Sequence, residues 1–264
     1  MEGTQNKCLN CNQPLSGKFC SNCGQRSNTH RITAQHFITH DLVHGVWHVD
    51  RGLFYTIKES VFRAGKASME YIEGKRIKYY NVFYLALLLL GANLLLQHYT
   101  SEMNSIKLNS AGEMTPIAEF LKRNIKIIIL LFIPVISIIG FLIFKKSKLN
   151  LAEHAIIAGF LFCGLLIMSI MQNLLYLLPV SVVNVFEYSL FPLIYIVQLI
   201  FPGWVYYQAI SKRFSKIGFF IRLLFFYLLT LIMYFFVLIV IILLYNYVIT
   251  GTWEMEGQLN FESN

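Results

Sequence analysis

Long apolar runs constrain this chain more than any other feature of its sequence. A helix needs about 20 apolar residues to cross a hydrocarbon core of ~30 Å. Five stretches meet that requirement, at residues 81–99, 124–144, 152–178, 186–207 and 217–249. Of the 264 residues 56% are hydrophobic and 14% are charged, and the mean hydropathy of +0.56 excludes a soluble globular protein. We therefore predict an all-α integral membrane protein with five transmembrane helices.

The positions of the basic residues predict how these helices are oriented. Lys and Arg in short connecting segments are retained on the cytoplasmic side of a membrane. Basic residues cluster before the first span and after the second and fourth spans, whereas the connection at residues 179–184 has none and residues 251–264 carry only acidic charges. The pattern predicts a cytoplasmic N-terminus and a C-terminus outside.

Four of the five cysteines form two pairs near the N-terminus. Cys8 and Cys11 make one CxxC pair, Cys20 and Cys23 make the other, and eight residues separate the pairs. Each CxxC turn directs two thiolates at one point, so two such turns joined by a hairpin complete a tetrahedron around Zn²⁺. The spacing predicts a small structural zinc ribbon, and the absence of an apolar signal-peptide core in residues 1–30 predicts that this head stays cytoplasmic.

Other interpretations of the cysteines stay open at this point. The thiols could be reduced or disulfide-bonded without a metal, and iron could replace zinc in a tetrathiolate site. Four protein ligands leave no coordination position for water or substrate, which disfavours a catalytic metal. The fifth cysteine, Cys163, falls inside the third span and is expected to be a buried small apolar residue.

A histidine repeat follows the head, on a helix expected from Thr33 to about Val49. Its histidines recur every four residues: His36, His40, His44 and His48. Adjacent pairs could hold a second metal ion, but the stripe turns by about 40° per step, so all four cannot converge on one ion. The same face could instead be the polar side of an amphipathic helix, or could change its contact with anionic lipid on protonation near pH ~6.5.

The segment 31–78 is predicted to lie along the membrane surface as short amphipathic helices, with Gly65 and Gly74 ending two of them. Six bases lie within residues 58–78: Lys58, Arg63, Lys66, Lys75, Arg76 and Lys78. Each base near an anionic leaflet contributes about 1 kcal/mol, so these side chains are expected to contact the membrane surface. The tyrosines beside them are better explained as interface anchors, and no nucleic acid is expected as a partner.

A combination of motifs in roughly the first 80 residues carries a family resemblance. The head CLNCNQPLSGKFCSNCGQ precedes Arg31-Ile-Thr33, Asp50-x-Gly52 with Thr56, and Tyr71-Ile-Glu-Gly74-Lys75-Arg76. Together they resemble a bacterial family of zinc-ribbon-headed multi-pass membrane proteins classed as a domain of unknown function. The resemblance implies a bacterial cytoplasmic (inner) membrane protein and brings no known activity. More loosely, the expected architecture is similar to that of the five-span Yip-type membrane proteins.

These features divide the chain into four parts and favour one function. Residues 1–30 are the zinc-ribbon head and linker, 31–78 the interfacial helices with a basic collar, 79–250 the five-helix bundle, and 251–264 an acidic tail. We favour a non-enzymatic membrane-anchored adaptor or assembly factor that recruits a protein partner through its head and contacts anionic lipid through its collar.

A transporter or lipid-handling protein regulated by the head is the alternative. Ion-coupled transport normally uses charged groups at mid-membrane, whereas the spans offer only polar amides: Asn93, Gln172, Asn173 and Gln198. A membrane enzyme would need an acid, base or nucleophile constellation, for which only Glu153 and His154 are candidates. A polar helix start explains that pair equally well, so no catalytic residue is assigned.

Overall fold

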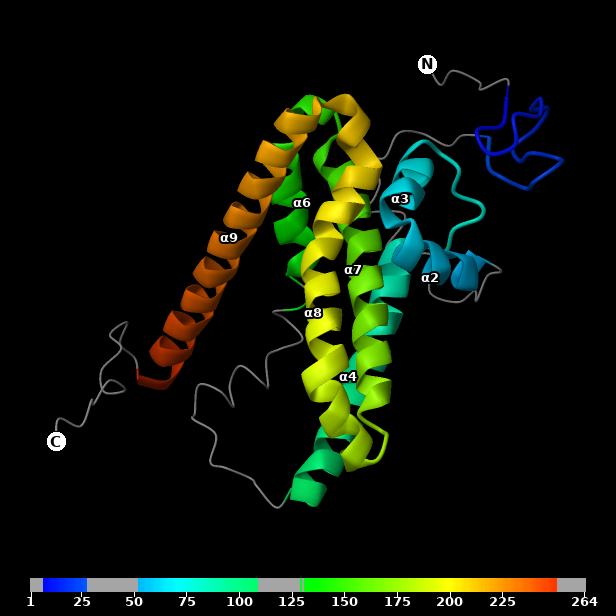
Figure 1. Cartoon of the computed structure of the whole chain (residues 1–264). Coiled ribbons are helices and arrows are strands. Elements are labelled where there is room, and N and C mark those ends of the chain that lie inside the picture. Colours follow the sequence, from blue (N-terminus) through cyan, green and yellow to red (C-terminus); the bar gives the residue numbers. More distant parts are fainter. Residues whose placement is uncertain (1–6, 28–51, 109–128, 130, 251–264) are drawn as a thin grey trace.

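The computed structural model describes residues 7–27, 52–108, 129 and 131–250 (Figure 1). Within these ranges the regular structure is helical, and extended pairing is limited to two isolated bridges in the head. The helices are α2 (Gly52–Phe62), α3 (Ala64–Ile72), α4 (Val82–Leu108), α6 (Phe132–Ile143), α7 (Leu151–Leu175), α8 (Val180–Ile210) and α9 (Lys216–Thr250). The head lies beside α2 and α3, near one end of the long helices.

Four of the described helices are long and apolar enough to cross a membrane. Their candidate spans are Val82–Ser101, Leu151–Leu175, Val180–Arg213 and Lys216–Leu244. They correspond to the first, third, fourth and fifth predicted spans. The described part of the chain is therefore all-helical, with long apolar helices like those of membrane proteins. The second predicted span overlaps α6, whose 12 residues are fewer than the ~20 that a crossing requires. Because residues 124–128 and 130 lie outside the described part, the second predicted span, and with it the total of five, stays a prediction.

Helix α7 is the centre of the bundle, because α2, α3, α4, α6 and α8 all pack against it. Its start is closed by a capping box with Asn150. The Asn150 side chain accepts a hydrogen bond from the Glu153 backbone N–H at 2.8 Å, and the Glu153 carboxylate accepts one from the Asn150 N–H at 2.7 Å. Glu153 therefore caps a helix start. Cys163 is fully buried in α7, as its sequence context predicts.

Helices approach each other closely at small residues. A β-carbon at Gly65 of α3 would lie 2.0 Å from the Val205 carbonyl oxygen of α8, and one at Gly164 of α7 would lie 2.4 Å from the Ser60 carbonyl oxygen of α2. The prediction that Gly65 ends a helix is wrong, because Gly65 lies in the first turn of α3 and permits this contact with α8. Gly74 does follow the end of α3, with a φ of +100° that suits a helix stop.

The short helices α2 and α3 bury small and polar residues, and α2 exposes two aromatic ones. Their buried residues are Gly52, Thr56, Glu59 and Ser60 on α2 and Ala64, Gly65, Ala67 and Ser68 on α3. Phe54 and Phe62 of α2 are 78% and 67% exposed. This arrangement of α2 is the reverse of that in a soluble amphipathic helix.

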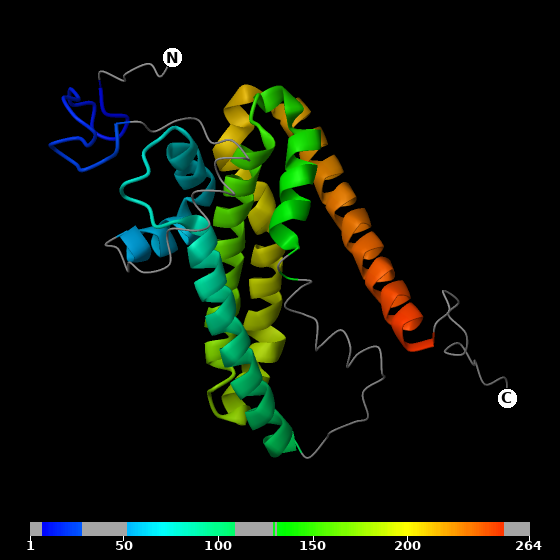
Figure 2. The same ribbon diagram turned by 180° about the vertical axis from the view of Figure 1, so that it is seen from behind.

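Pro202 interrupts the hydrogen bonding of α8, and Tyr227 of α9 bridges the break. The Gly203 N–H donates to the Tyr227 hydroxyl at 2.9 Å, and the hydroxyl donates to the Leu199 carbonyl at 2.9 Å. The Tyr227 hydroxyl thus lies between the Gly203 N–H and the Leu199 carbonyl, which in an uninterrupted helix are hydrogen-bonded directly to each other. Beyond this contact α9 leans away from α8, as both views of the ribbon show (Figures 1 and 2).

We expect Gly65→Ala to destabilise the protein by about 1–3 kcal/mol, because the new methyl group overlaps the backbone of α8. Gly91→Ala is the matched control, since Gly91 lies within α4 and a β-carbon there meets nothing within 4 Å. This control should be neutral or stabilising by up to about 1 kcal/mol. Thermal unfolding of the two purified variants in mild detergent gives the comparison, and equal midpoints would contradict the close α3–α8 contact.

Candidate metal centre

The head consists of two knuckles with the same backbone geometry. In the first, the Cys8 N–H donates to the Gln13 carbonyl at 2.8 Å and the Asn12 N–H donates to the Cys8 carbonyl at 2.9 Å. In the second, the Cys20 N–H donates to the Gln25 carbonyl at 2.8 Å and the Gly24 N–H donates to the Cys20 carbonyl at 2.8 Å. The residue after the second cysteine of each pair is left-handed, with φ of +61° at Asn12 and +76° at Gly24. Asn and Gly are the residues that adopt this conformation most readily.

The two knuckles bring the four cysteine sulfurs to one point. All four Sγ atoms lie within 4.8 Å of one another. Cys8 and Cys23 are 3.5 Å apart, as are Cys11 and Cys20, and none of the four is disulfide-bonded. A tetrahedral ion with Zn–S bonds of about 2.3 Å separates its sulfurs by about 3.8 Å, so the cluster fits a tetrathiolate metal site.

The surroundings of Cys11 favour the thiolate that a metal binds. The pKa of the Cys11 thiol is lowered to about 6, mainly by a hydrogen bond from the backbone of Gln13. Desolvation acts in the opposite direction, and a hydrogen bond from the Asn22 side chain lowers the pKa further. A thiolate present at neutral pH is the ligand form of cysteine.

Gln25 connects the second knuckle to the loop after α3. Its side chain is 3% exposed. Its amide nitrogen donates to the Gly74 carbonyl at 2.6 Å, and its amide oxygen accepts a hydrogen bond from the Ile77 N–H at 3.4 Å. The backbone carbonyl of the same residue belongs to the knuckle. Gln25 therefore holds the head against the bundle, whereas Gln13, its counterpart in the first knuckle, is exposed.

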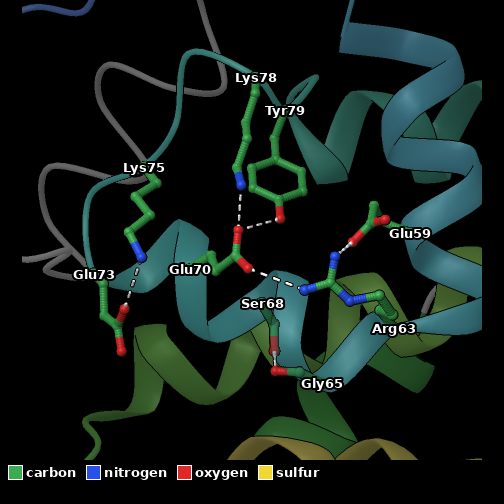
Figure 3. A network of polar contacts seen from close by, with 9 residues as sticks. All are labelled: Glu59, Arg63, Gly65, Ser68, Glu70, Glu73, Lys75, Lys78 and Tyr79. Atoms are coloured by element: carbon green, nitrogen blue, oxygen red, sulfur yellow. Dashed lines mark hydrogen bonds and ion pairs between the residues drawn. The ribbon is translucent and has the colours of Figure 1, made fainter. Parts of the chain in front are cut away.

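A network of charged side chains lies next to this contact, centred on Glu70 of α3 (Figure 3). The Arg63 guanidinium contacts Glu70 at 3.2 Å and Glu59 at 2.9 Å. Lys78 forms an ion pair with the other Glu70 oxygen, to which the Tyr79 hydroxyl donates a hydrogen bond at 3.0 Å. Burial opposes the charged form of Glu70, but these contacts outweigh it and hold the pKa of the carboxyl below its usual value. The network joins α2, α3 and the loop that leads into α4.

Motif residues of the resemblance also contribute to this part of the fold. The Thr56 hydroxyl donates to the Gly52 carbonyl at 2.8 Å and accepts from the Tyr80 N–H at 2.8 Å. A β-carbon at Gly52 would lie 3.0 Å from the Lys78 carbonyl oxygen and the Tyr80 nitrogen. Gly52 and Thr56 thus fix the start of α2 to the chain segment before α4. Three sets of contacts meet here: those of the Gln25 side chain, the Glu70 network, and those of Gly52 and Thr56. We call them together the junction.

The six predicted membrane-contact bases occupy different environments. Lys58 and Lys66 are exposed. Arg63 and Lys78 belong to the Glu70 network, and Lys75 lies 3.7 Å from Glu73. The Arg76 guanidinium donates to the Tyr71 carbonyl at 3.3 Å and lies over the Tyr71 ring at 5.6 Å. Four of the six bases therefore bind other groups of the protein: Arg63, Lys75, Arg76 and Lys78.

Two further groups were singled out by the sequence. The histidine repeat, His36, His40, His44 and His48, lies outside the described residues. The intramembrane amides Asn93, Gln172, Asn173 and Gln198 all line one cavity of about 680 Å³ between α4, α7 and α8. In this cavity the Asn173 amide donates to Asn93 at 3.1 Å and the Gln172 amide donates to the Tyr195 hydroxyl at 2.8 Å.

Sequence reasoning missed Gln25, Glu70 and Tyr79. A signal for Gln25 is present, because a glutamine stands two residues after the second cysteine in both knuckles. Only the fold distinguishes the buried Gln25 from the exposed Gln13. For Glu70 and Tyr79 no local pattern separates them from other acidic and aromatic residues of the collar.

We expect the purified protein to contain one zinc ion per chain, and Cys20→Ser to lose it, because a metal is what folds so small a head. Ser21→Ala changes an exposed residue within the same CxxC and should retain the metal. Elemental analysis for zinc and iron, with limited proteolysis of the head, measures both effects. A wild-type protein without stoichiometric metal would contradict the site.

We expect Glu70→Gln to destabilise the protein by about 1–2 kcal/mol at neutral pH, a value reduced because Arg63 and Lys78 are partly exposed. Since the folded pKa of Glu70 is lowered, its stabilising effect is present above the unfolded value of 4.5 and is lost as the pH falls through the folded value. The difference between the two proteins in thermal unfolding should therefore shrink in acid. Glu73→Gln, at an exposed carboxylate of the same segment, should have little effect at either pH.

Comparison with known proteins gives no match for this chain. No family model, no curated protein and no solved structure is similar to it. The function proposed below rests on the residues of the chain and their geometry.

Proposed function

We propose that the protein is a non-enzymatic membrane-anchored adaptor or assembly factor whose cytoplasmic head, folded around a structural Zn²⁺, binds a protein partner. The observation that carries the proposal is the attachment of the head through Gln25, with Phe19 of the same head 56% exposed. A site with four cysteine ligands has no open position for a substrate, so structural support is the role that such a metal serves.

The outer surface of the head has the composition of a protein-binding site. Phe19 is 56% exposed, and the Arg26 guanidinium lies over its ring at 5.9 Å. Aromatic and Arg side chains contribute most to binding energy at protein interfaces, and a pair already in contact loses little freedom on binding. Phe19 and Arg26 are the contact residues that we assign to the partner.

The anchor in this proposal is a bundle of five spans in the bacterial inner membrane, with the N-terminus cytoplasmic and the C-terminus outside. The four long apolar helices and the basic connections support it, and the family resemblance agrees. Phe54, Lys58 and Phe62 recur every four residues along α2 and are exposed, and Lys66 is exposed on α3. Such a stripe suits contact with an anionic leaflet, aromatic rings in the interface and ammonium groups at the headgroups.

A transporter or lipid-handling function is the second candidate, and the amide-lined cavity supports it. The polar groups that line this cavity are uncharged, so it suits a neutral hydrogen-bonding solute better than an ion. Two of its amides already pair with other side chains, as interhelical hydrogen-bonding groups do, which is why we place this function second.

A pull-down from cells in mild detergent tests the adaptor function. We expect partners bound by the intact chain to be lost from a chain without residues 1–30 and strongly reduced by Phe19→Ala with Arg26→Ala, since contact residues of this type contribute ~2 kcal/mol or more. Gln13→Ala, at an exposed site of the first knuckle, is the control and should retain them. A partner set unchanged by removal of the head would contradict the adaptor and favour the second candidate.

A further inference from the structure

A large apolar groove lies between α8 and α9, away from the metal centre and adjoining the amide-lined cavity at Leu199. Its volume is about 1120 Å³, slightly above the ~300–1,000 Å³ range of small-molecule sites. The groove lies at the end of the bundle where α8 and α9 are joined, between residues 199–212 and 214–227. The Tyr227 hydroxyl and Gly203 join the two helices within it and fix their separation there.

The walls of the groove are apolar and exposed. Leu199 and Ile200 of α8 are 68% and 60% exposed, and Phe220 of α9 is 62% exposed. Trp204 and Tyr207 stack on each other at 6.0 Å and line the same groove closer to the end of α8. Trp and Tyr favour the level of the lipid headgroups, so this end of the groove lies at the membrane interface and the remainder lies in the hydrocarbon.

Two lysines stand at the interface end of the groove. Lys212 and Lys216 both line it, both are exposed, and neither forms an ion pair with another described residue. The sequence has no Asp or Glu from residue 188 to residue 253, so α8 beyond its first turns and all of α9 offer these lysines no carboxylate. A basic pocket between membrane helices at the headgroup level suits a phosphate group.

The geometry points to a binding site for an anionic phospholipid, with an acyl chain in the groove between α8 and α9 and the phosphate at Lys212 and Lys216. Trp204 and Tyr207 lie between these two parts, at the depth of the glycerol backbone. This site is separate from the adaptor function and does not depend on it. It gives the exposed side of α9 next to α8 a defined lipid partner.

A phospholipid accounts for both the apolar walls and the two lysines, whereas a free phosphate or a second copy of this chain accounts for only one of these features. A free phosphate would need only the lysines and would leave the apolar walls uncovered. A second copy of this chain would cover the walls but would bring the same excess of basic residues to the lysines. Like charges placed together in this way disfavour such a pairing.

Native mass spectrometry of the delipidated full-length protein tests the site, with phosphatidylglycerol and phosphatidylcholine of identical acyl chains as probes. We expect one tightly bound phosphatidylglycerol and clearly weaker phosphatidylcholine. Replacing both lysines, as Lys212→Gln with Lys216→Gln, should weaken phosphatidylglycerol binding roughly 25-fold, because each base near an anionic headgroup contributes about a factor of five. Lys145→Gln with Lys146→Gln, exposed lysines after α6 that do not line the groove, should leave binding unchanged.

The acyl-chain part is tested by narrowing the groove. Ile200→Trp places a larger side chain on its wall and should reduce lipid occupancy at least several-fold, whereas Leu193→Trp changes an equally exposed residue of α8 outside the groove and should not. Equal binding of the two lipids, equal effects of the two lysine pairs, or equal effects of the two tryptophans would overturn the assignment. Displacement of the lipid by free glycerol phosphate would overturn it in favour of a phosphate site.

Discussion

Close approach of helix backbones at small residues is the interaction on which the rest of this structure depends. In a hydrocarbon solvent, large apolar side chains gain little by leaving lipid for protein, so helices associate where their backbones come near enough to pack. Gly65 brings α3 against the backbone of α8, and Gly164 brings α7 against α2. Because the short helices are fixed on the bundle in this way, their polar residues have a rigid base on which to build the junction.

A continuous series of hydrogen bonds leads from the cysteine cluster to the bundle. The Cys20 N–H pairs with the Gln25 carbonyl, and the Gln25 side chain pairs with Gly74 and Ile77. One residue thus belongs to the second cysteine knuckle of the head and binds the loop that leads into the first span. A partner bound to the head would therefore be held at a defined orientation to the membrane, as an adaptor requires.

The cavity between α4, α7 and α8 and the groove between α8 and α9 differ in chemistry because their walls come from different kinds of contact. Between α4, α7 and α8 the helices are close enough for amide side chains such as Asn93 and Asn173 to meet, and the cavity there is polar and uncharged. Between α8 and α9 the contacts are the hydrogen bonds of the Tyr227 hydroxyl and aromatic pairs such as Tyr206 with Phe226 at 4.8 Å. That space is apolar, with its charge confined to the end where α8 and α9 are joined.

The sequence alone determined the features that depend on neighbours along the chain. The spacing of Cys8, Cys11, Cys20 and Cys23 predicts their cluster because each knuckle is a local turn, and four spans are recognisable because about 20 consecutive apolar residues suffice to define one. Only the tertiary structure decided which distant groups meet. It pairs Arg63 and Lys78 with Glu70, gives Gly65 a packing role in place of a helix stop, and gathers the four intramembrane amides around one cavity. Such pairings depend on how helices pack, and that packing depends on the shapes of surfaces that no local pattern records.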